Sequence, residues 1–124
     1  ALQKERHLLD STRQVVQTNL ERFRDKVKLN VGGSRFETSL HTLQRFPDSM
    51  LGVMFSGQQG IPVQQDADGY VFIDRSGKHF GTILDYLRDG EVPDVLPEDE
   101  GERAQLAREA RFYMLPELVD ALGT

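Results

Sequence analysis

The side chains best suited to catalysis in this 124-residue sequence lie between Asp74 and Asp85, where hydroxyl, imidazole and carboxylate groups come close together. Ser76, His79 and one of the two carboxylates are the residue types of a nucleophilic triad. The same serine precedes an amphipathic segment, where a hydroxyl is favoured as a helix N-cap. We therefore predict that Ser76 caps a helix. The residues offer no assembled acid and base set, and the protein is not expected to be an enzyme.

The sequence does not support a metal site or a phosphate-binding site either. His7, His41 and His79 are far apart in the sequence and lack ligand spacing, and the chain has no cysteine. Gly32-Gly33 follows a strand-like segment, but neither GxGxxG nor GxxxxGK[ST] is present, and a tight turn explains the pair. We expect no metal and no cofactor.

Charge is divided unevenly along the chain. Residues 1–28 hold seven Lys or Arg against four Asp or Glu, a net charge of +3, and residues 29–124 hold eight against sixteen, a net charge of −8. Such an acidic body repels polyanions, so we expect no nucleic-acid partner. The longest apolar run is a few residues, so no membrane span is expected. The absence of cysteine favours a reducing setting, the cytoplasm, with the nucleus as an alternative.

Hydrophobic spacing predicts the main elements. Phe80, Ile83, Leu84 and Leu87 fall on one face of a helix that Gly90 ends. Alternation around Gly32-Gly33 predicts a hairpin. Further expected elements are helices over 50–56, 102–114 and 116–122, and a strand over 70–73 that is covered on both faces.

The first 26 residues form a separate N-terminal arm. Leu2, Leu9, Val16 and Phe23 recur every seven residues, which is typical of one seam of a coiled coil. The companion seam positions are polar. A single amphipathic helix lying on a neighbour and a true coiled coil therefore both remain open.

Two places hold more apolar residues than a core requires. The helix from Met50 is apolar nearly all round, which favours docking of Leu51, Met54 and Phe55 to another chain. In the helix over 102–114, Met114 groups with the core side and Phe112 falls on the polar side. An exposed Phe offers area that a partner, or the next helix, can cover.

The segments VKLNVGGSRFETSLHTL, PDSML, MFSG, GYVFIDRSGKHFGTILDYLRDG and EARFYML occur in this order. Residues 27 to about 122 thereby resemble the BTB/POZ domain of the potassium-channel tetramerisation type, and particularly its adaptor subgroup. The resemblance implies an α/β fold of the α+β kind, a small three-stranded sheet flanked by helices, over 27–124. The preceding arm, 1–26, lies outside the shared domain.

The resemblance also implies function. Family members close into rings of four or five, and many adaptors bind the N-terminal region of a cullin in a ubiquitin ligase. The cullin-facing positions map onto the helix with Leu51, Met54 and Phe55 and onto Phe112. The ring contacts of the family are largely polar, which makes candidates of four further residues: Arg35, Asp74, Arg75 and Asp85.

Two rival functions remain open from the sequence. One is a cytoplasmic tetramerisation domain of a voltage-gated potassium channel, and the other is a ring-forming scaffold that binds no cullin. A fivefold ring would exclude the channel.

Overall fold

The computed structural model describes residues 2–21, 25–57 and 63–123, with side chains in the first helix from Asp10 to Leu20. The elements along the chain are α1 (Leu2–Glu21), β1 (Lys26–Val31), β2 (Ser34–Ser39), α2 (Leu40–Leu43), α3 (Met50–Met54), β3 (Tyr70–Ile73), α4 (Phe80–Asp89), α5 (Glu100–Phe112) and α6 (Pro116–Ala121). After α1, helices and strands mix around one sheet, which is the α+β organisation that the sequence predicts.

The three strands form one mixed sheet in the order β2-β1-β3. β1 pairs antiparallel with β2 and parallel with β3. The predicted hairpin turn is present, with φ of 58° at Gly32 and 101° at Gly33, values that favour glycine. The Asn30 side-chain oxygen accepts a hydrogen bond from the Gly33 amide at 2.8 Å, which fixes the turn.

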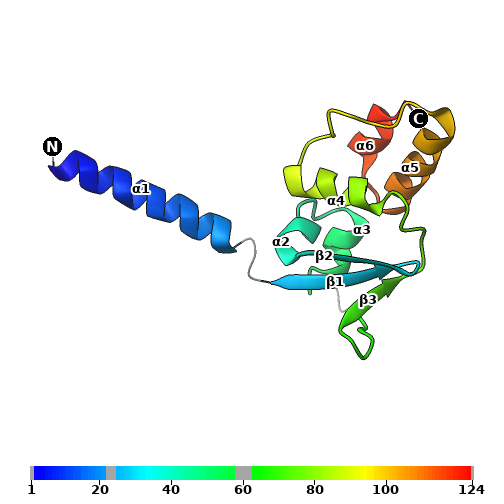
Figure 1. The fold of residues 1–124 in the computed structure, drawn as a ribbon, viewed down its shortest axis with the longest axis horizontal. Helices are drawn as coiled ribbons and strands as arrows, with labels where there is room; N and C mark the ends of the chain where they lie inside the picture. The colour runs from blue at the N-terminus through cyan, green and yellow to red at the C-terminus, as the bar shows by residue number, and fades with distance from the viewer. Residues whose placement is uncertain (1, 22–24, 58–62, 124) are drawn as a thin grey trace.

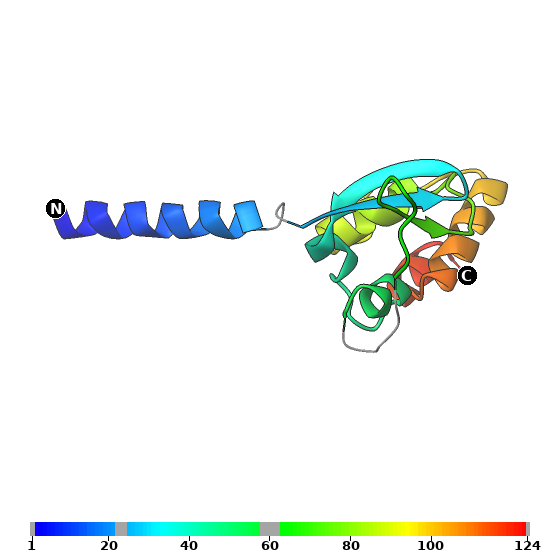
Figure 2. The same ribbon diagram turned by 90° about the horizontal axis from the view of Figure 1, so that it is seen from below.

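Helices cover one face of this sheet (Figures 1 and 2). The inward-pointing strand residues Leu29, Val31 and Val71 are buried, and they face the apolar stripe of α4. The predicted stripe residues of α4 are all buried: Phe80, Ile83, Leu84 and Leu87. Gly90 ends α4 in the left-handed conformation at φ 73°, also as predicted.

Aromatic rings connect the layers of the core. The Phe80 ring centroid lies 5.0 Å from that of Phe36 on β2 and 5.4 Å from that of Tyr113 after α5. Phe46 stacks on Tyr86 at 5.0 Å. Such pairs add to the burial energy of each ring, so they hold the end of α5 against the sheet and α4.

Some predictions from the sequence need correction. Ser76 does not cap α4, because its hydroxyl oxygen accepts from the Lys78 amide at 3.3 Å and the helix begins only at Phe80. Strand β3 is covered on one face, since Phe72 is 58% exposed. The helix predicted from residue 102 begins at Glu100 because Asp99, whose carboxylate accepts from the Glu102 amide at 3.0 Å, caps it.

The N-terminal arm contains the predicted helix, α1. Its described side chains, residues 10–20, are all exposed, including Val15, Val16 and Leu20. The remaining seam positions, Leu2, Leu9 and Phe23, lie outside the described side chains, so the choice between a single helix and a coiled coil stays a prediction. Among the described residues, no helix combines the length and the apolar character needed to cross a bilayer.

Candidate interaction surfaces

Helix α3 is anchored at its start. The Ser49 hydroxyl oxygen accepts from the Gly52 amide at 3.1 Å and its proton is donated to the Phe46 carbonyl at 2.7 Å. The Met50 amide donates to the Tyr113 carbonyl at 3.0 Å, which joins α3 to the end of α5. The two segments that the sequence predicts to be cullin-facing therefore meet in the fold.

The predicted contact residues on α3 differ in accessibility. Leu51 is only 1% exposed, so the prediction that it contacts a partner needs correction: its side chain belongs to the core. Met54 and Phe55 are half-buried and pack against the core with part of each side chain accessible. Phe55 also lines a hollow with Val27 and Val63, on the sheet side of α3.

Phe112 is half-buried under a guanidinium group. Its ring meets Tyr113 edge-on at 5.0 Å, and the Arg75 guanidinium lies over it at 4.4 Å from the ring centroid. The covering residue is thus Arg75, at the end of β3, and no contact with α6 is needed to explain the burial. A cation placed over an aromatic ring is attracted by its negative face.

The same guanidinium forms a two-pronged ion pair with Glu109. Arg75 Nε donates to Glu109 Oε1 at 3.1 Å and Nη2 to Oε2 at 2.6 Å. Glu109 is 6% exposed, which makes this the buried ion pair of the site. Hydrogen bonding to Glu109 raises the pKa of Arg75, and burial, with Glu109 adding to it, raises the pKa of Tyr113. Arg75, Glu109 and Phe112 are called the Arg75 cluster below.

Met114, just after the end of α5, is an exposed apolar side chain that the sequence predicts on the core side of the helix. Met114 does not face the core: it lies beyond the helix with φ of 59° and is 58% exposed. It borders a groove of about 440 Å³ between the ends of α5 and α6. The groove is lined by Asp48, Arg111, Met114, Leu115, Pro116, Val119 and Asp120. The helical periodicity misplaced Met114 because the predicted helix was continued to residue 114.

The four residues predicted as ring contacts do not form one cluster. Arg35 points outward from β2, with its guanidinium 4.8 Å from the Tyr70 ring centroid, and Lys28 lies over the same ring at 5.3 Å. Asp74 is exposed just after β3. Arg75 belongs to the Arg75 cluster, where its guanidinium is engaged within the protomer.

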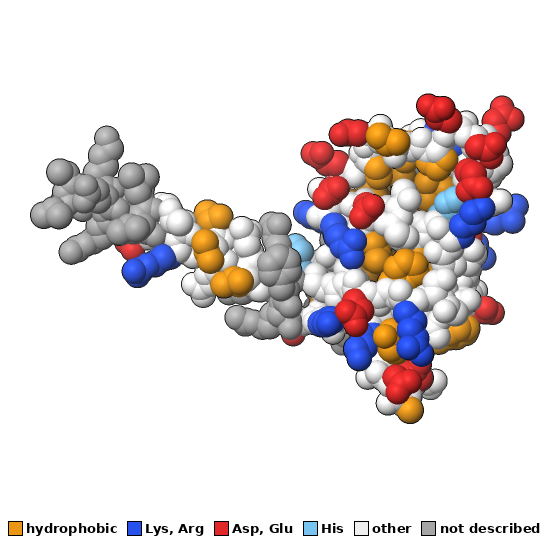
Figure 3. Space-filling view, in the orientation of Figure 1, with side chains coloured by type: hydrophobic (Ala, Val, Ile, Leu, Met, Phe, Trp, Pro, Cys, Tyr) orange, Lys and Arg blue, Asp and Glu red, His pale blue; other side chains and the backbone are white. Residues whose placement is uncertain are grey.

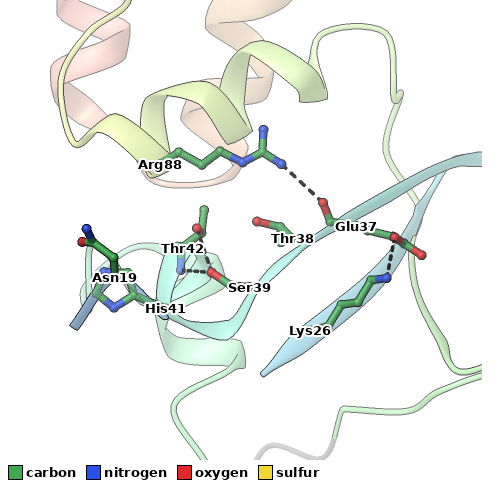
Figure 4. Close-up of a pocket in the computed structure, with 8 residues that line it drawn as sticks. All are labelled: Asn19, Lys26, Glu37, Thr38, Ser39, His41, Thr42 and Arg88. Atoms are coloured by element: carbon green, nitrogen blue, oxygen red, sulfur yellow. Dashed lines mark hydrogen bonds and ion pairs between the residues drawn. The ribbon is translucent and has the colours of Figure 1, made fainter. Parts of the chain in front are cut away.

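Asp85 lies on the exposed side of α4, next to the edge of the sheet. Arg88 pairs with it at 3.4 Å and donates to the Glu37 carbonyl on β2 at 3.3 Å. The Glu37 carboxylate pairs with Lys26 at 3.0 Å, as Figure 4 shows. The edge strand β2 is thus lined with charge, which disfavours indiscriminate strand pairing and suits a specific polar contact.

The acidic character of the body is concentrated in one region. Figure 3 shows acidic side chains crowding the end of the domain that carries the loop between α4 and α5. Exposed members there are Glu91, Asp94, Glu98, Asp99 and Glu100. Within the described ranges, no group of three His, Asp or Glu side chains is arranged to hold a metal ion.

Comparison with known proteins agrees with this architecture. Residues 27–122 match the family described as BTB/POZ domain, and the chain belongs to that family. It is 51% identical over 98 residues to proteins of Homo sapiens and Mus musculus named BTB/POZ domain-containing protein KCTD21, a match covering 79% of this chain and 36% of theirs. It is 50% identical over 97 residues to FH protein interacting protein FIP2 of Arabidopsis thaliana, covering 77% of this chain and 31% of that protein.

These likenesses define the domain type. The chain is a BTB/POZ domain of the potassium-channel tetramerisation (KCTD) type, a module for protein interaction and oligomerisation. It spans about a third of the length of the curated relatives it matches.

Proposed function

We propose that this chain is the scaffold-binding part of a ubiquitin ligase adaptor: it assembles with copies of itself into a ring of four or five and binds the N-terminal region of a cullin. It would act in the cytoplasm, with the nucleus as an alternative. Its contribution is proximity, because a ring presents several copies of each bound partner and raises their effective concentration.

One observation carries the cullin part of the proposal. The hydrogen bond from the Met50 amide to the Tyr113 carbonyl, 3.0 Å long, joins the start of α3 to the end of α5, so the two segments with surplus apolar residues adjoin. Met54 and Phe112 are half-buried there, so each keeps apolar area for a partner. The proposed contact surface contains Met54, Phe55 and Phe112, without the buried Leu51.

The ring part of the proposal uses polar residues. Arg35 on the outward side of β2, with its guanidinium over the Tyr70 ring, and Asp85 on the exposed side of α4 carry opposite charges, and Asp74 adds an exposed carboxylate just after β3. Opposite charges on matching surfaces set orientation and register between copies. Arg75 stays a candidate ring contact, although Glu109 and Phe112 engage its guanidinium within the protomer, and the particle mass of Arg75→Met tests it.

The experiment separates the two contacts. Purified chain is mixed with a cullin N-terminal region, the dissociation constant is measured by calorimetry, and particle mass is measured by native mass spectrometry. Met54→Asp and Phe112→Asp should each weaken binding about tenfold or more, because a carboxylate replaces a side chain whose burial contributes about 2 kcal/mol, and both should keep the ring. Arg35→Glu and Asp85→Arg should lower the particle mass.

Val95→Asp serves as control, since Val95 is 86% exposed in the loop before α5. It should change neither readout. The cullin assignment is wrong if neither apolar variant weakens binding while the ring persists. The whole proposal is wrong if the unmodified chain stays a single subunit at high concentration and binds no cullin.

A further inference from the structure

A hollow of about 720 Å³ lies beside β2, the edge strand of the sheet, and near the end of α4 (Figure 4). Its polar lining includes Lys26 of β1, Thr38 and Ser39 of β2, Thr42 of α2 and Arg88 of α4. These residues are spread over more than 60 positions of the sequence, so no local motif signals them. The volume lies within the range of protein sites that hold small molecules.

The hydroxyl groups of this hollow have protons for which the protein supplies no acceptor. Thr38 is only 9% exposed, and its buried hydroxyl has no hydrogen-bond partner among the described residues. The Ser39 and Thr42 hydroxyl oxygens lie 3.0 Å apart, so one of them donates to the other. That bond uses one of the two protons of the pair, and the second proton needs a further acceptor. Because a buried polar group without a partner costs stability, a ligand that accepts hydrogen bonds here is favoured.

The Arg88 guanidinium adds charge to these donors. Its Nη1 donates to Asp85 Oδ1 at 3.4 Å and its Nη2 to the Glu37 carbonyl at 3.3 Å. Both distances exceed the usual N–H···O distance of about 2.9 Å, and a guanidinium has five N–H donors in all. The Arg88 side chain is 45% exposed, so a ligand can reach it. A guanidinium in this state is suited to two-pronged binding of phosphate or carboxylate oxygens.

We propose that this hollow binds a phosphate group, either free or carried by a small organic molecule. Figure 4 shows Thr38 between the Arg88 guanidinium and the Ser39–Thr42 pair. A phosphate group has three strong acceptor oxygens, so it can accept from the guanidinium on one side and from the hydroxyls on the other. A carboxylate has two oxygens and satisfies fewer of these donors. Cullin binding and ring formation do not enter this inference.

The charge at the margin of the hollow predicts a variant that binds more tightly. Lys26 Nζ pairs with Glu37 Oε2 at 3.0 Å, and the two side chains are 63% and 46% exposed. Glu37 therefore cancels one of the cations that line the hollow and repels an incoming anion. Glu37→Gln should lower the dissociation constant for phosphate about threefold, most clearly at low salt where screening is least.

The experiment is titration calorimetry in a low-salt buffer, with inorganic phosphate, glycerol 2-phosphate and acetate as probes. Both phosphates should bind with dissociation constants of about 1 mM or lower, and acetate should bind at least about tenfold more weakly. A lower constant for the ester than for inorganic phosphate identifies a phosphorylated small molecule as the ligand. Equal constants identify free phosphate, and both results support the inference.

Two variants test the assigned contacts. Arg88→Gln should raise the dissociation constant for phosphate about tenfold, because a charged donor pair is lost. Thr38→Val should raise it about threefold, while the urea midpoint stays equal or rises, because a buried hydroxyl without a partner is removed. A purely structural role of Thr38 would not move binding and stability in opposite directions.

The matched control is Arg108→Gln, which removes an exposed cation on α5 that does not line the hollow and should leave binding unchanged. The inference is overturned if the unmodified chain binds phosphate no more tightly than acetate. It is also overturned if Arg108→Gln weakens binding as much as Arg88→Gln does, or if Thr38→Val leaves binding unchanged.

Discussion

Removing the cation of the Arg75 cluster should destabilise the domain far more than removing an exposed one. In Arg75→Met the Glu109 carboxylate, 6% exposed, loses the two hydrogen bonds of 3.1 and 2.6 Å that satisfy both of its oxygens. Methionine keeps an unbranched apolar side chain at this position but is shorter than arginine. The change therefore removes both the ion pair with Glu109 and the cation–π contact with the Phe112 ring.

The magnitude follows from the burial of each partner. Breaking a buried ion pair on one side costs about 3–5 kcal/mol, because an uncompensated charge remains in a medium of low polarity. The side chain of Arg75 is 27% exposed, so water can partly replace it, and we expect a loss of about 3 kcal/mol in the free energy of unfolding. Changing both residues, Arg75→Met with Glu109→Met, should restore stability to within about 1 kcal/mol.

The assay is urea unfolding at about pH 7 and fixed protomer concentration, because assembly couples stability to concentration. The matched control is Lys78→Met, which breaks the exposed pair between Lys78 and Glu102, 2.8 Å long with side chains 55% and 37% exposed. That pair should contribute at most about 1 kcal/mol. The reasoning is refuted if Arg75→Met loses no more than Lys78→Met, or if the double variant is as unstable as the sum of the single ones.

Two further predictions concern a buried hydroxyl and a turn. The Tyr113 hydroxyl is buried with no hydrogen-bond partner among the described residues, so Tyr113→Phe should be as stable as the unmodified chain at pH 7 or more stable by about 1 kcal/mol in urea unfolding. Burial raises the folded-state pKa of Tyr113 above its ordinary value of 10, so the contribution of this group to stability is fully present below about pH 10 and is lost by about 1.4 kcal/mol per pH unit above it. This part of the pH dependence should be absent from the Phe variant. Gly32→Ala should lower the thermal midpoint more than Gly33→Ala does. Both glycines have positive φ, but only at Gly32 would the new Cβ collide with the Arg75 carbonyl. Equal losses in the two variants would show that the collision does not affect stability.

The sequence alone predicts those elements whose type and buried face follow from the spacing of their own apolar or turn residues. Phe80, Ile83 and Leu87 repeat with the helical period, so the sequence specifies both α4 and the face it buries. Gly32-Gly33 has the conformational freedom that a tight turn demands, and the hairpin forms around it. In both cases the deciding interactions lie within a few residues along the chain.

The residues whose positions were predicted wrongly are placed by contacts with parts of the chain more than a few residues away. Ser76 has the chemistry of an N-cap, but the chain leaves β3 through a turn that delays the helix by three residues. Phe72 was assigned to a strand covered on both faces, and no local signal shows that the protomer leaves the outward face open. Met114 was predicted on the core side of a helix that in fact ends at Phe112. The Arg75–Glu109 pair joins residues 34 positions apart, which only the tertiary fold brings together.

The Arg75 cluster also bears on how the two proposed contacts coexist. Because its guanidinium is held by Glu109 and Phe112, Arg75 is poorly placed to reach a neighbouring copy, and its loss should leave the particle mass unchanged. The proposed ring contacts would then be Arg35, on the outward face of β2, and Asp85, on the exposed side of α4, and they share no residue with the proposed cullin surface of Met54, Phe55 and Phe112. Two contacts that use different residues can form at the same time, so ring closure would leave every copy able to bind a cullin, as a multivalent adaptor requires.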